Sequence, residues 1–587
     1  MKKILLATIV LFSLASWQSR EEGEWKDKVD TSLIEKTAAG EEVEFLILMK
    51  EQADVSGSRQ FRLKAERGAF VFEKLQAVAK QTQGPVIALL EQAKVSYRSF
   101  YIVNAILAKG DLELIRQLAQ LDAVAQVQDN PVVNLQEPLA DSGEAPVSFR
   151  DGGVEWGIDK INADDVWAMG YTGQGVIIGG QDTGYDWDHP AIKDSYRGWD
   201  GNNADHNHNW HDAIHELIGD PNNANPCGLD SAEPCDDHSH GTHTMGTMAG
   251  AESDEGKSIG VAPGARWIAC RNMEQGDGTP ATYIECFEWF LAPYGLNGEG
   301  ADVSYSPHVI NNSWSCPESE GCNPSNFATM QMVVDNLKAS GIVVVVSAGN
   351  NGSSCETVNT PAAMYENSFS IGATQQNDTI ASFSSRGPVM LDGSGRLKPN
   401  VSAPGVGVRS SVLNGGFASF SGTSMAGPHV AGLVALLISA KPELAGQVEE
   451  IETIIEQTAA PLLSGQDCGD FSGQAVPNAV YGYGRVDALA AVLEVLEVSG
   501  TDGQAETGRL KVFPNPTSGQ AFFQMDGVKG AALVQAFSLS GQLVYSNRWD
   551  ADSGNIMQVD LSPLPSGIYW YRVVTDDKQY KGKLVRQ

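Results

Sequence analysis

The chain has 587 residues, 42% of them hydrophobic, and a formal net charge of −33 at pH 7. That length suggests about four domains and leaves ample material for a large core. A surplus of negative charge this large argues against binding to nucleic acid or to anionic membranes. The composition therefore favours a folded, multidomain protein with neither of these two kinds of partner.

The first residues, MKKILLATIVLFSLAS, place two lysines before an apolar run that ends in small residues. This pattern is typical of a secretory signal peptide, which we assign to residues 1–19, and the run is too short to span a membrane. Further along the chain, no stretch approaches 18 uninterrupted apolar residues. We therefore expect an exported protein without a transmembrane segment in its mature chain.

All eight cysteines lie between Cys227 and Cys468. An even number in an exported chain favours disulfides over metal thiolates, although spacing alone leaves the connectivity open. The pairs Cys227/Cys235 and Cys316/Cys322 are the easiest to bridge because they are so close in sequence. Cys270/Cys286 is a less secure pair.

The pattern of apolar residues divides the chain into three parts. Residues 42–137 contain a strand, a long helical stretch over 60–93, a strand over 99–108, a helix and a final strand, as in a small α+β domain. Residues 154–498 alternate short apolar runs with helical stretches, which predicts an α/β domain with a parallel sheet flanked by helices. Residues 509–587 show β-type alternation and form the predicted small all-β domain. Polar linkers rich in Gly separate the three parts.

Polar residues follow the apolar runs of the middle part. Asp182 ends GVIIGGQD, His240 lies in DDHSHGTHTMG, Asn350 ends VVVVSAGN, and Ser424 precedes an apolar helix in SGTSMAGPHVAG. A serine hydroxyl needs a base to take its proton, and the base needs an acceptor that fixes its tautomer. A side-chain amide suits the oxyanion that then develops. These four residue types together indicate nucleophilic acyl transfer.

Three neighbouring residues compete for these roles. His429 lies five residues after Ser424, roughly 140° away around a helix, so it cannot easily reach the hydroxyl. His243 is three residues from His240 and points only about 60° away, so spacing alone leaves both open. Asn350 and Asn351 are similarly ambiguous.

The blocks DTG, HGTHTMG and GTSMAGP, in this order, resemble the catalytic blocks of the subtilisin-like serine proteases, the subtilases. The stretches WDHPAIK, YRGWDG and EWFLAP are similar to the bacillopeptidase F branch of that family. The resemblance implies a secreted serine endopeptidase with Asp182 as orienting acid, His240 as general base, Ser424 as nucleophile and Asn350 as oxyanion donor.

The resemblance also implies a location for the pocket that holds the substrate residue before the cleaved bond (the S1 pocket). Its walls should involve Ser313, Trp314, Ser315 and Asn359. Neither the segment Ser313–Ser315 nor the residues just before Pro361, such as Asn359, include an acidic side chain. We therefore expect the S1 pocket to prefer neutral or apolar substrate residues. Protein and peptide substrates are the partners that this chemistry predicts.

The flanking parts resemble known modules as well. Residues 42–137 are similar to the inhibitory propeptides of subtilases (the inhibitor I9 type), which implies a precursor that its own propeptide blocks; an ordinary small binding domain is the alternative. The tail, with KVFPNPTSG and LSPLPSGIYWYRV, resembles the C-terminal sorting domain of the type IX secretion system. Its alternative is a carbohydrate-binding or fibronectin-like module. A secreted or cell-surface location follows.

No cofactor is required for this chemistry. The histidine-rich stretch 206–216 lacks an HExxH pattern, so a catalytic zinc is disfavoured. Structural calcium suits the oxygen-rich segment DGNNADHNHN (200–209), and the resemblance is to a family that often binds it, but no spacing names its ligands. A different class of function is a catalytically silent binding protein or adhesin on the same fold. Such proteins usually lack one triad residue, whereas all three are present here.

Overall fold

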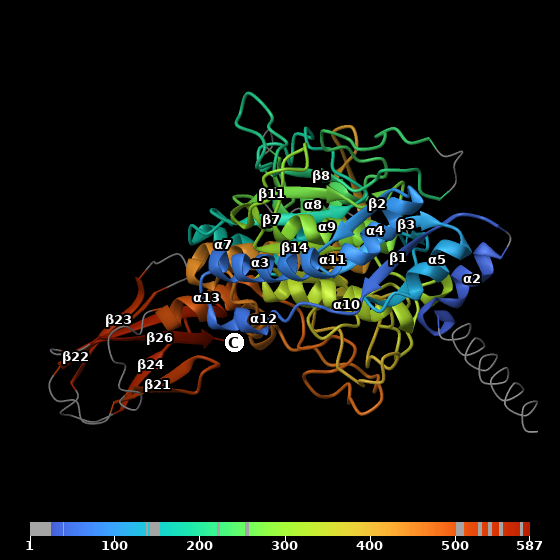
Figure 1. Ribbon diagram of the computed structural model, residues 1–587. Helices are drawn as coiled ribbons and strands as arrows, with labels where there is room; N and C mark the ends of the chain where they lie inside the picture. The colour runs from blue at the N-terminus through green and yellow to red at the C-terminus, as the bar shows by residue number, and fades with distance from the viewer. Residues whose placement is uncertain are drawn as a thin grey trace, which may run out of the picture. The chain divides into compact units, whose positions relative to one another are not determined.

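The computed structural model describes residues 25–38, 40–136, 139–140, 153–219, 224–252, 257–499, 510–525, 531–537, 543–550, 556–575 and 579–586. The predicted signal peptide (1–19) and most of both linkers lie outside these ranges. The chain divides into two compact units near Val492. The first unit holds the N-terminal domain and the large α/β domain, and the second holds the C-terminal strands (Figure 1).

The N-terminal domain is a four-stranded antiparallel sheet covered by helices. Its strand order is β2-β3-β1-β4, and Trp25, Val29 and Leu33 extend its apolar core to residues before 42. Asp111 begins the last helix by accepting a hydrogen bond from Leu114 N at 2.9 Å. The elements are η1 (Trp25–Lys28), α2 (Thr31–Thr37), β1 (Val43–Met49), η2 (Ser56–Gln60), α3 (Lys64–Thr82), α4 (Gly84–Ala93), β2 (Tyr97–Phe100), β3 (Ala105–Gly110), α5 (Leu112–Ala119) and β4 (Val124–Asp129).

Two predicted elements of this domain are each divided in the structure. The helical stretch over 60–93 begins at Lys64 and is interrupted between α3 and α4, where Pro85 lacks an N–H and so favours the start of a new helix. The strand over 99–108 is two strands, β2 and β3, joined by a turn at 101–104. Two backbone donors of the turn, Tyr101 N and Ile102 N, bond to Glu288 of the α/β domain. Local sequence pattern cannot reveal such contacts.

The α/β domain is built on a seven-stranded sheet in the order β17-β16-β15-β14-β7-β11-β8, and all of its strand pairs are parallel. Most of these strands are fully buried because helices cover both faces, so they read as continuous apolar runs. The strands are β7 (Ile177–Asp182), β8 (Trp210–Asp212), β11 (Arg266–Arg271), β14 (Val309–Asn312), β15 (Val343–Ser347), β16 (Phe369–Thr374) and β17 (Val401–Pro404). This is the fold class that the sequence predicts.

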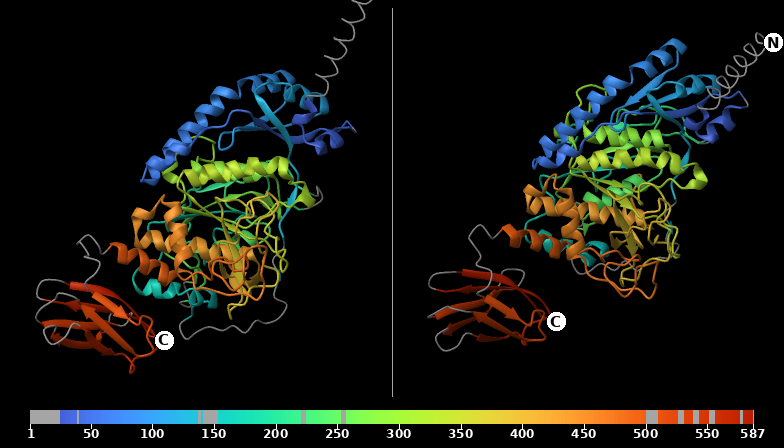
Figure 2. Two further views of the ribbon diagram at one scale, coloured as in Figure 1. Left: turned by 90° about the horizontal axis from the view of Figure 1, so that it is seen from below. Right: turned by 60° about the horizontal axis from the view of Figure 1, so that its bottom comes forward.

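Four helices flank this sheet. Helices α8 (His240–Ala249) and α11 (Thr423–Ala440) pack on one face, whereas α9 (Pro280–Leu291) and α10 (Pro324–Ala339) pack on the other. Among the described residues, α11 alone is long and apolar enough to cross a membrane, but 89% of it is buried, as expected of a core helix. The N-terminal domain lies against α9 and α10, as Figure 2 shows.

Shorter elements connect these parts and cover the sheet edges. They are β5 (Val133–Asn134), β6 (Leu139–Ala140), α6 (Trp156–Lys160), α7 (Ala163–Ala168), β9 (Ala251–Glu252), β10 (Lys257–Ser258), β12 (Met273–Glu274), β13 (Asp277–Gly278), η3 (Val303–Tyr305), η4 (Glu318–Glu320), β18 (Val408–Val412), β19 (Gly416–Ser421), η5 (Pro442–Leu444), α12 (Val448–Thr458) and α13 (Ala488–Ser499).

The C-terminal unit is all-β, as predicted. One sheet has the order β20-β21-β24 and the other β23-β22-β25-β26, with every pair antiparallel. Phe523, Val534 and Leu584 lie in the apolar core of this unit. Its strands are β20 (Leu510–Phe513), β21 (Gln520–Met525), β22 (Ala531–Phe537), β23 (Leu543–Asp550), β24 (Ile556–Asp560), β25 (Gly567–Val574) and β26 (Gln579–Arg586).

Four disulfides join all eight cysteines. Three of them are short-range. Cys227–Cys235 and Cys316–Cys322 are the pairs that close spacing favours, and Cys270–Cys286 is the pair that the sequence left less secure. The fourth, Cys355–Cys468, spans 113 residues and ties the segment after Asn350 to the end of the α/β domain.

Loop length predicts how much each disulfide stabilises the fold. In the chain-entropy account, removing Cys355–Cys468 should cost roughly 5 kcal/mol and removing Cys316–Cys322, of separation 6, roughly 2 kcal/mol. The measurement is guanidinium unfolding of the two double Cys→Ser variants. Equal losses would contradict this entropic explanation.

Candidate active site

The site lies at the carboxyl end of the sheet, where the direction of strand order reverses. Strand β7 has β11 on one side and β14 on the other, which makes its end a topological switch point. Asp182 is the last residue of β7, and Asn312 and Ser313 lie at the end of β14. Open α/β sheets bind ligands at such a position.

Asp182 and His240 form a buried hydrogen-bonded pair. His240 Nδ1 lies 2.7 Å from Asp182 Oδ1, which also accepts from Thr183 N at 2.8 Å, and both side chains are almost fully buried. His240 is the first residue of α8, and the second is Gly241. A Cβ at Gly241 would lie 2.0 Å from the carbonyl oxygen of Gly184, so only glycine lets this helix begin against the end of β7. The carboxylate binds Nδ1, so Nε2 is the ring nitrogen on the side away from Asp182.

Ser424 lies in the first turn of α11, beside Asn350. Asn350 Oδ1 accepts hydrogen bonds from Thr423 N and Thr423 Oγ1, both at 2.9 Å. Because a backbone N–H can only donate, these contacts identify the amide oxygen and leave the NH₂ group on the opposite side. Ser424 is 5% exposed, and its backbone N–H belongs to the donors that a helix start leaves free.

A small pocket surrounds Ser424 and Asn350. Ser313, Trp314 and Ser315 line it. Its remaining lining residues in the α/β domain are Ser347, Gly349 and Thr423. The stacking of Trp314 on Tyr283, with ring centroids 4.0 Å apart, fixes the position of that wall. Asn359, the fourth residue predicted for the S1 pocket, is exposed and does not line this pocket.

The two other histidines considered from the sequence are core residues. His243 Nε2 contacts Val408 O at 3.0 Å and its ring stacks on Phe420, while His429 Nδ1 contacts Met425 O at 2.9 Å. Burial lowers the pKa of His243 to about 3 and that of His429 to about 4. Both imidazoles are therefore neutral at ordinary pH.

Sequence reasoning did not identify three residues that contribute to the site. Thr423 orients Asn350 through two hydrogen bonds and lies within the GTS block. Its place next to Ser424 in that block is the signal that could have identified it. Leu135 and Gln136 of the N-terminal part also line the Ser424 pocket. Only the long-range path of the chain brings these two residues there, and no local pattern signals it.

Within the described ranges, no group of three or more His, Cys, Asp or Glu side chains is arranged to hold a metal ion. The histidines of 206–216 make other contacts: His206 with Tyr196, His208 with Pro293 O, and His211 and His215 with Glu285. The calcium site stays a prediction.

Comparisons with known proteins agree with this geometry. The model of the subtilase family matches residues 173–484, which is more than half of the chain. The chain belongs to the subtilase family. Bacillopeptidase F of Bacillus subtilis (strain 168) is 34% identical over 511 residues, which cover 82% of this chain and 33% of that protein. Subtilisin E of the same organism is 30% identical over 62% of this chain and 78% of its own length.

This subtilase thus spans about a third of the length of bacillopeptidase F. The thermophilic serine proteinase of Bacillus sp. (strain AK1) is 30% identical over 64% of the chain. A second family model, the secretion system C-terminal sorting domain, matches residues 511–587, so the β-unit is a sorting domain. The sorting domain indicates export, followed by release or attachment to the cell surface.

The buried neutral histidines predict a specific acid sensitivity. Their pKa is lowered on folding, so stability is complete above the unfolded pKa of about 6.5 and declines as pH falls toward the folded pKa. Each such histidine should contribute a slope of about 1.4 kcal/mol per pH unit. Unfolding titrations of His429→Leu between pH 6.5 and 4 should show a slope reduced by that amount. An unchanged slope would show that His429 is not neutral in the folded protein.

Proposed function

We propose that this subtilase is a secreted serine endopeptidase that is made as a self-inhibited precursor. The observation that carries the proposal is the buried His240–Asp182 hydrogen bond of 2.7 Å at the end of β7, together with a pocket lined by Ser424 and Asn350. These four residues have the chemistry of base, orienting acid, nucleophile and oxyanion donor. The family membership makes hydrolysis of peptide bonds the natural reaction.

The catalytic cycle follows from these contacts. His240 Nε2 takes the Ser424 hydroxyl proton as Oγ adds to the substrate carbonyl carbon, and Asp182 steadies the imidazolium through Nδ1. The negative charge on the carbonyl oxygen is stabilised by the Asn350 amide and the Ser424 backbone N–H. The intermediate then expels the amine, which receives the proton from His240. Water repeats the sequence on the acyl-enzyme and releases the acid.

The N-terminal part supports self-inhibition because two of its residues, Leu135 and Gln136, line the Ser424 pocket. Strand β5 pairs antiparallel with β13, and Leu135 N donates to Gly276 O at 2.7 Å. Beyond the pocket, β6 pairs antiparallel with β19, where Leu139 lies opposite Ser421. Main-chain hydrogen bonds of this kind are how an extended substrate binds. Gln136 lines the same pocket as Ser424, so we expect self-cleavage at the bond after Gln136.

The contact of Gln136 also suggests the substrate preference. Its Nε2 donates to Asn351 Oδ1 at 3.3 Å, and the pocket walls carry no charged side chain among their lining residues. A neutral residue therefore suits this position, in agreement with the preference expected from the sequence.

Docking of the N-terminal domain supports its role as propeptide. Glu288 Oε2 on α9 accepts from Tyr101 N at 2.5 Å and Ile102 N at 2.9 Å, and Asn336 on α10 donates to Ile102 O at 2.7 Å. Apolar residues of both domains, including Phe100 and Phe287, belong to one continuous core cluster. Such an interface holds the propeptide in place after cleavage.

The first test concerns the catalytic residues. Ser424→Ala should lower peptide hydrolysis by about 10⁶-fold, as in the subtilisin example, and leave the precursor uncut. His240→Ala should behave alike, whereas His243→Gln, matched in position on the same helix turn, should mainly lower stability. The measurement is hydrolysis of casein by purified protein together with the mass of the chain. Hydrolysis by Ser424→Ala at the wild-type rate would refute the proposal and favour a silent binding protein.

The second test concerns propeptide release. Burial raises the pKa of Glu288 to about 8 in the complex, and that of Glu44, at the same interface, to about 7. A carboxyl group whose pKa is raised in the complex stabilises the complex fully below the pKa of the free group, near 4.5. This stabilisation is lost as the pH rises through the pKa that the group has in the complex. Burial lowers the pKa of Lys64 to about 7. Lys64 therefore makes the complex more stable as the pH rises, but only above pH 7.

Release of the cleaved propeptide should therefore become faster between pH 5 and pH 7. The lag before activity appears in freshly cleaved precursor measures this release. Glu288→Gln should weaken the pH dependence because it cannot ionise. A lag that lengthens with rising pH would contradict the interpretation, and terminal sequencing of the released chain checks the cut after Gln136.

A further inference from the structure

A buried arginine lies at the same carboxyl end of the sheet as the His240–Asp182 pair. Arg271 is the last residue of β11, and in the register of the sheet it lies opposite Asp182 on β7 and Asp212 on β8. Residues in register on parallel neighbours point to the same face of a sheet. The three side chains therefore leave the sheet on one face, next to one another.

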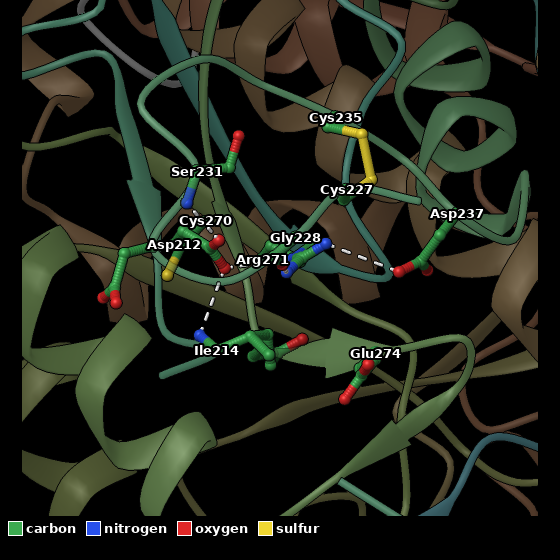
Figure 3. A network of polar contacts seen from close by, with 12 residues as sticks. Asp212, Ile214, Cys227, Gly228, Ser231, Cys235, Asp237, Cys270, Arg271 and Glu274 are labelled. Carbon is green, nitrogen blue, oxygen red and sulfur yellow. Dashed lines mark hydrogen bonds and ion pairs between the residues drawn. A yellow bond between two sulfur atoms is a disulfide. The ribbon is translucent and has the colours of Figure 1, made fainter. Parts of the chain in front are cut away.

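The Arg271 guanidinium joins three separate segments. Its Nε donates to Asp212 Oδ1 at 3.0 Å, Nη2 to Gly228 O at 2.6 Å and Nη1 to Asp237 Oδ2 at 3.4 Å. The side chains of Arg271 and Asp237 are 0% exposed and that of Asp212 is 2% exposed. Figure 3 shows Arg271 between Asp212 and Asp237, below the disulfide Cys227–Cys235. A planar fork with several donors can serve three acceptors at once, which an ammonium group does less well.

One of these segments leads directly into the catalytic helix. Cys235 O accepts from Tyr185 N at 3.1 Å, and Asp236 pairs with Gly184, two residues after Asp182. Asp236 also accepts from Thr183 Oγ1 at 2.9 Å and from Thr242 N at 3.0 Å. Asp236 thus connects the end of β7 to the first turn of α8.

The next residue faces Arg271 instead. Asp237 Oδ1 accepts from Gln275 N at 2.8 Å, and its other oxygen faces Arg271. Two consecutive aspartates therefore fix the segment on two sides, and only His238 and Ser239 separate them from His240.

We propose that Arg271 is a positioning residue for His240, acting through Asp237. The Arg271 guanidinium holds the segment between the Cys227–Cys235 loop and α8 in place. It thereby keeps the His240 imidazole within hydrogen-bonding distance of Asp182 Oδ1. This inference rests on the proposed function, because it concerns the efficiency with which His240 activates Ser424. A misplacement of a catalytic group by about 1 Å can cost about 10²-fold in rate.

The alternative is that Arg271 only neutralises two buried carboxylates and so stabilises the fold. The two roles differ in one observable, the reaction of Ser424 with a fluorophosphonate. Loss of folded protein lowers the fraction of enzyme that is labelled, whereas misplacement of His240 lowers the rate constant of the molecules that are folded.

The experiment uses the full chain, matured by affinity-tagged wild-type enzyme that is then removed. Arg271→Lys keeps the charge and loses the fork, and we expect its labelling rate constant and kcat to fall about 10- to 100-fold with KM within twofold. Arg266→Lys, at the exposed start of the same strand, is the matched control and should label at the wild-type rate. The second variant, Arg271→Met with Asp212→Asn and Asp237→Asn, removes the charge together with both of its carboxylate partners. Its stability should therefore be regained, whereas its labelling rate constant should stay low.

The outcomes are distinguishable. A wild-type rate constant in Arg271→Lys, or in the folded fraction of the triple variant, would overturn the positioning role and leave only charge neutralisation. If the wild-type enzyme itself does not react with the fluorophosphonate, the proposed function fails, whatever the Arg271 variants do.

Discussion

His240 can reach Asp182 only because helix α8 begins directly against the end of strand β7. The close approach of Gly241 to the Gly184 carbonyl makes this contact sterically possible. The 2.7 Å hydrogen bond to Asp182 then fixes the ring and its tautomer. Ser424 lies on α11, which packs against α8 on the same face of the sheet, and Thr423 orients Asn350 beside it. The fold contributes rigid strand and helix ends, and the proposed chemistry depends on their relative placement.

The same sheet end explains why the N-terminal domain and the active site form one unit. The domain packs on α9 and α10, on the face of the sheet opposite α8 and α11. Leu135 and Gln136, in its final segment, line the Ser424 pocket at the carboxyl end of the sheet. Burial of Glu288 beneath the turn at 101–104 links this docking to protonation. In the proposed scheme one interface serves folding, inhibition and pH-dependent release. The sorting domain is a separate unit with its own core and adds export rather than chemistry.

Much of this organisation could be predicted from the sequence. The buried parallel strands are visible in the sequence as apolar runs. The blocks around Asp182, His240 and Ser424 are also visible, because each is a short local motif at a strand end or a helix start. Long-range contacts could not be predicted. The choice between His240 and His243 needed the family pattern, and only tertiary packing explains it, because His243 stacks on Phe420. The turn that separates β2 from β3 is bound by Glu288, far along the chain. The three contacts of Arg271 come from the end of β8 and from two loop residues, Gly228 and Asp237.

The central claim is that Ser424 is the nucleophile that His240 and Asp182 activate. The most direct measurement is peptide mapping by mass spectrometry of the mature enzyme after reaction with a fluorophosphonate at neutral pH. The account predicts a single adduct, on the peptide that contains Ser424, and its loss in His240→Ala while that protein remains folded. An adduct on another residue, or undiminished labelling of Ser424 without His240, would contradict the account.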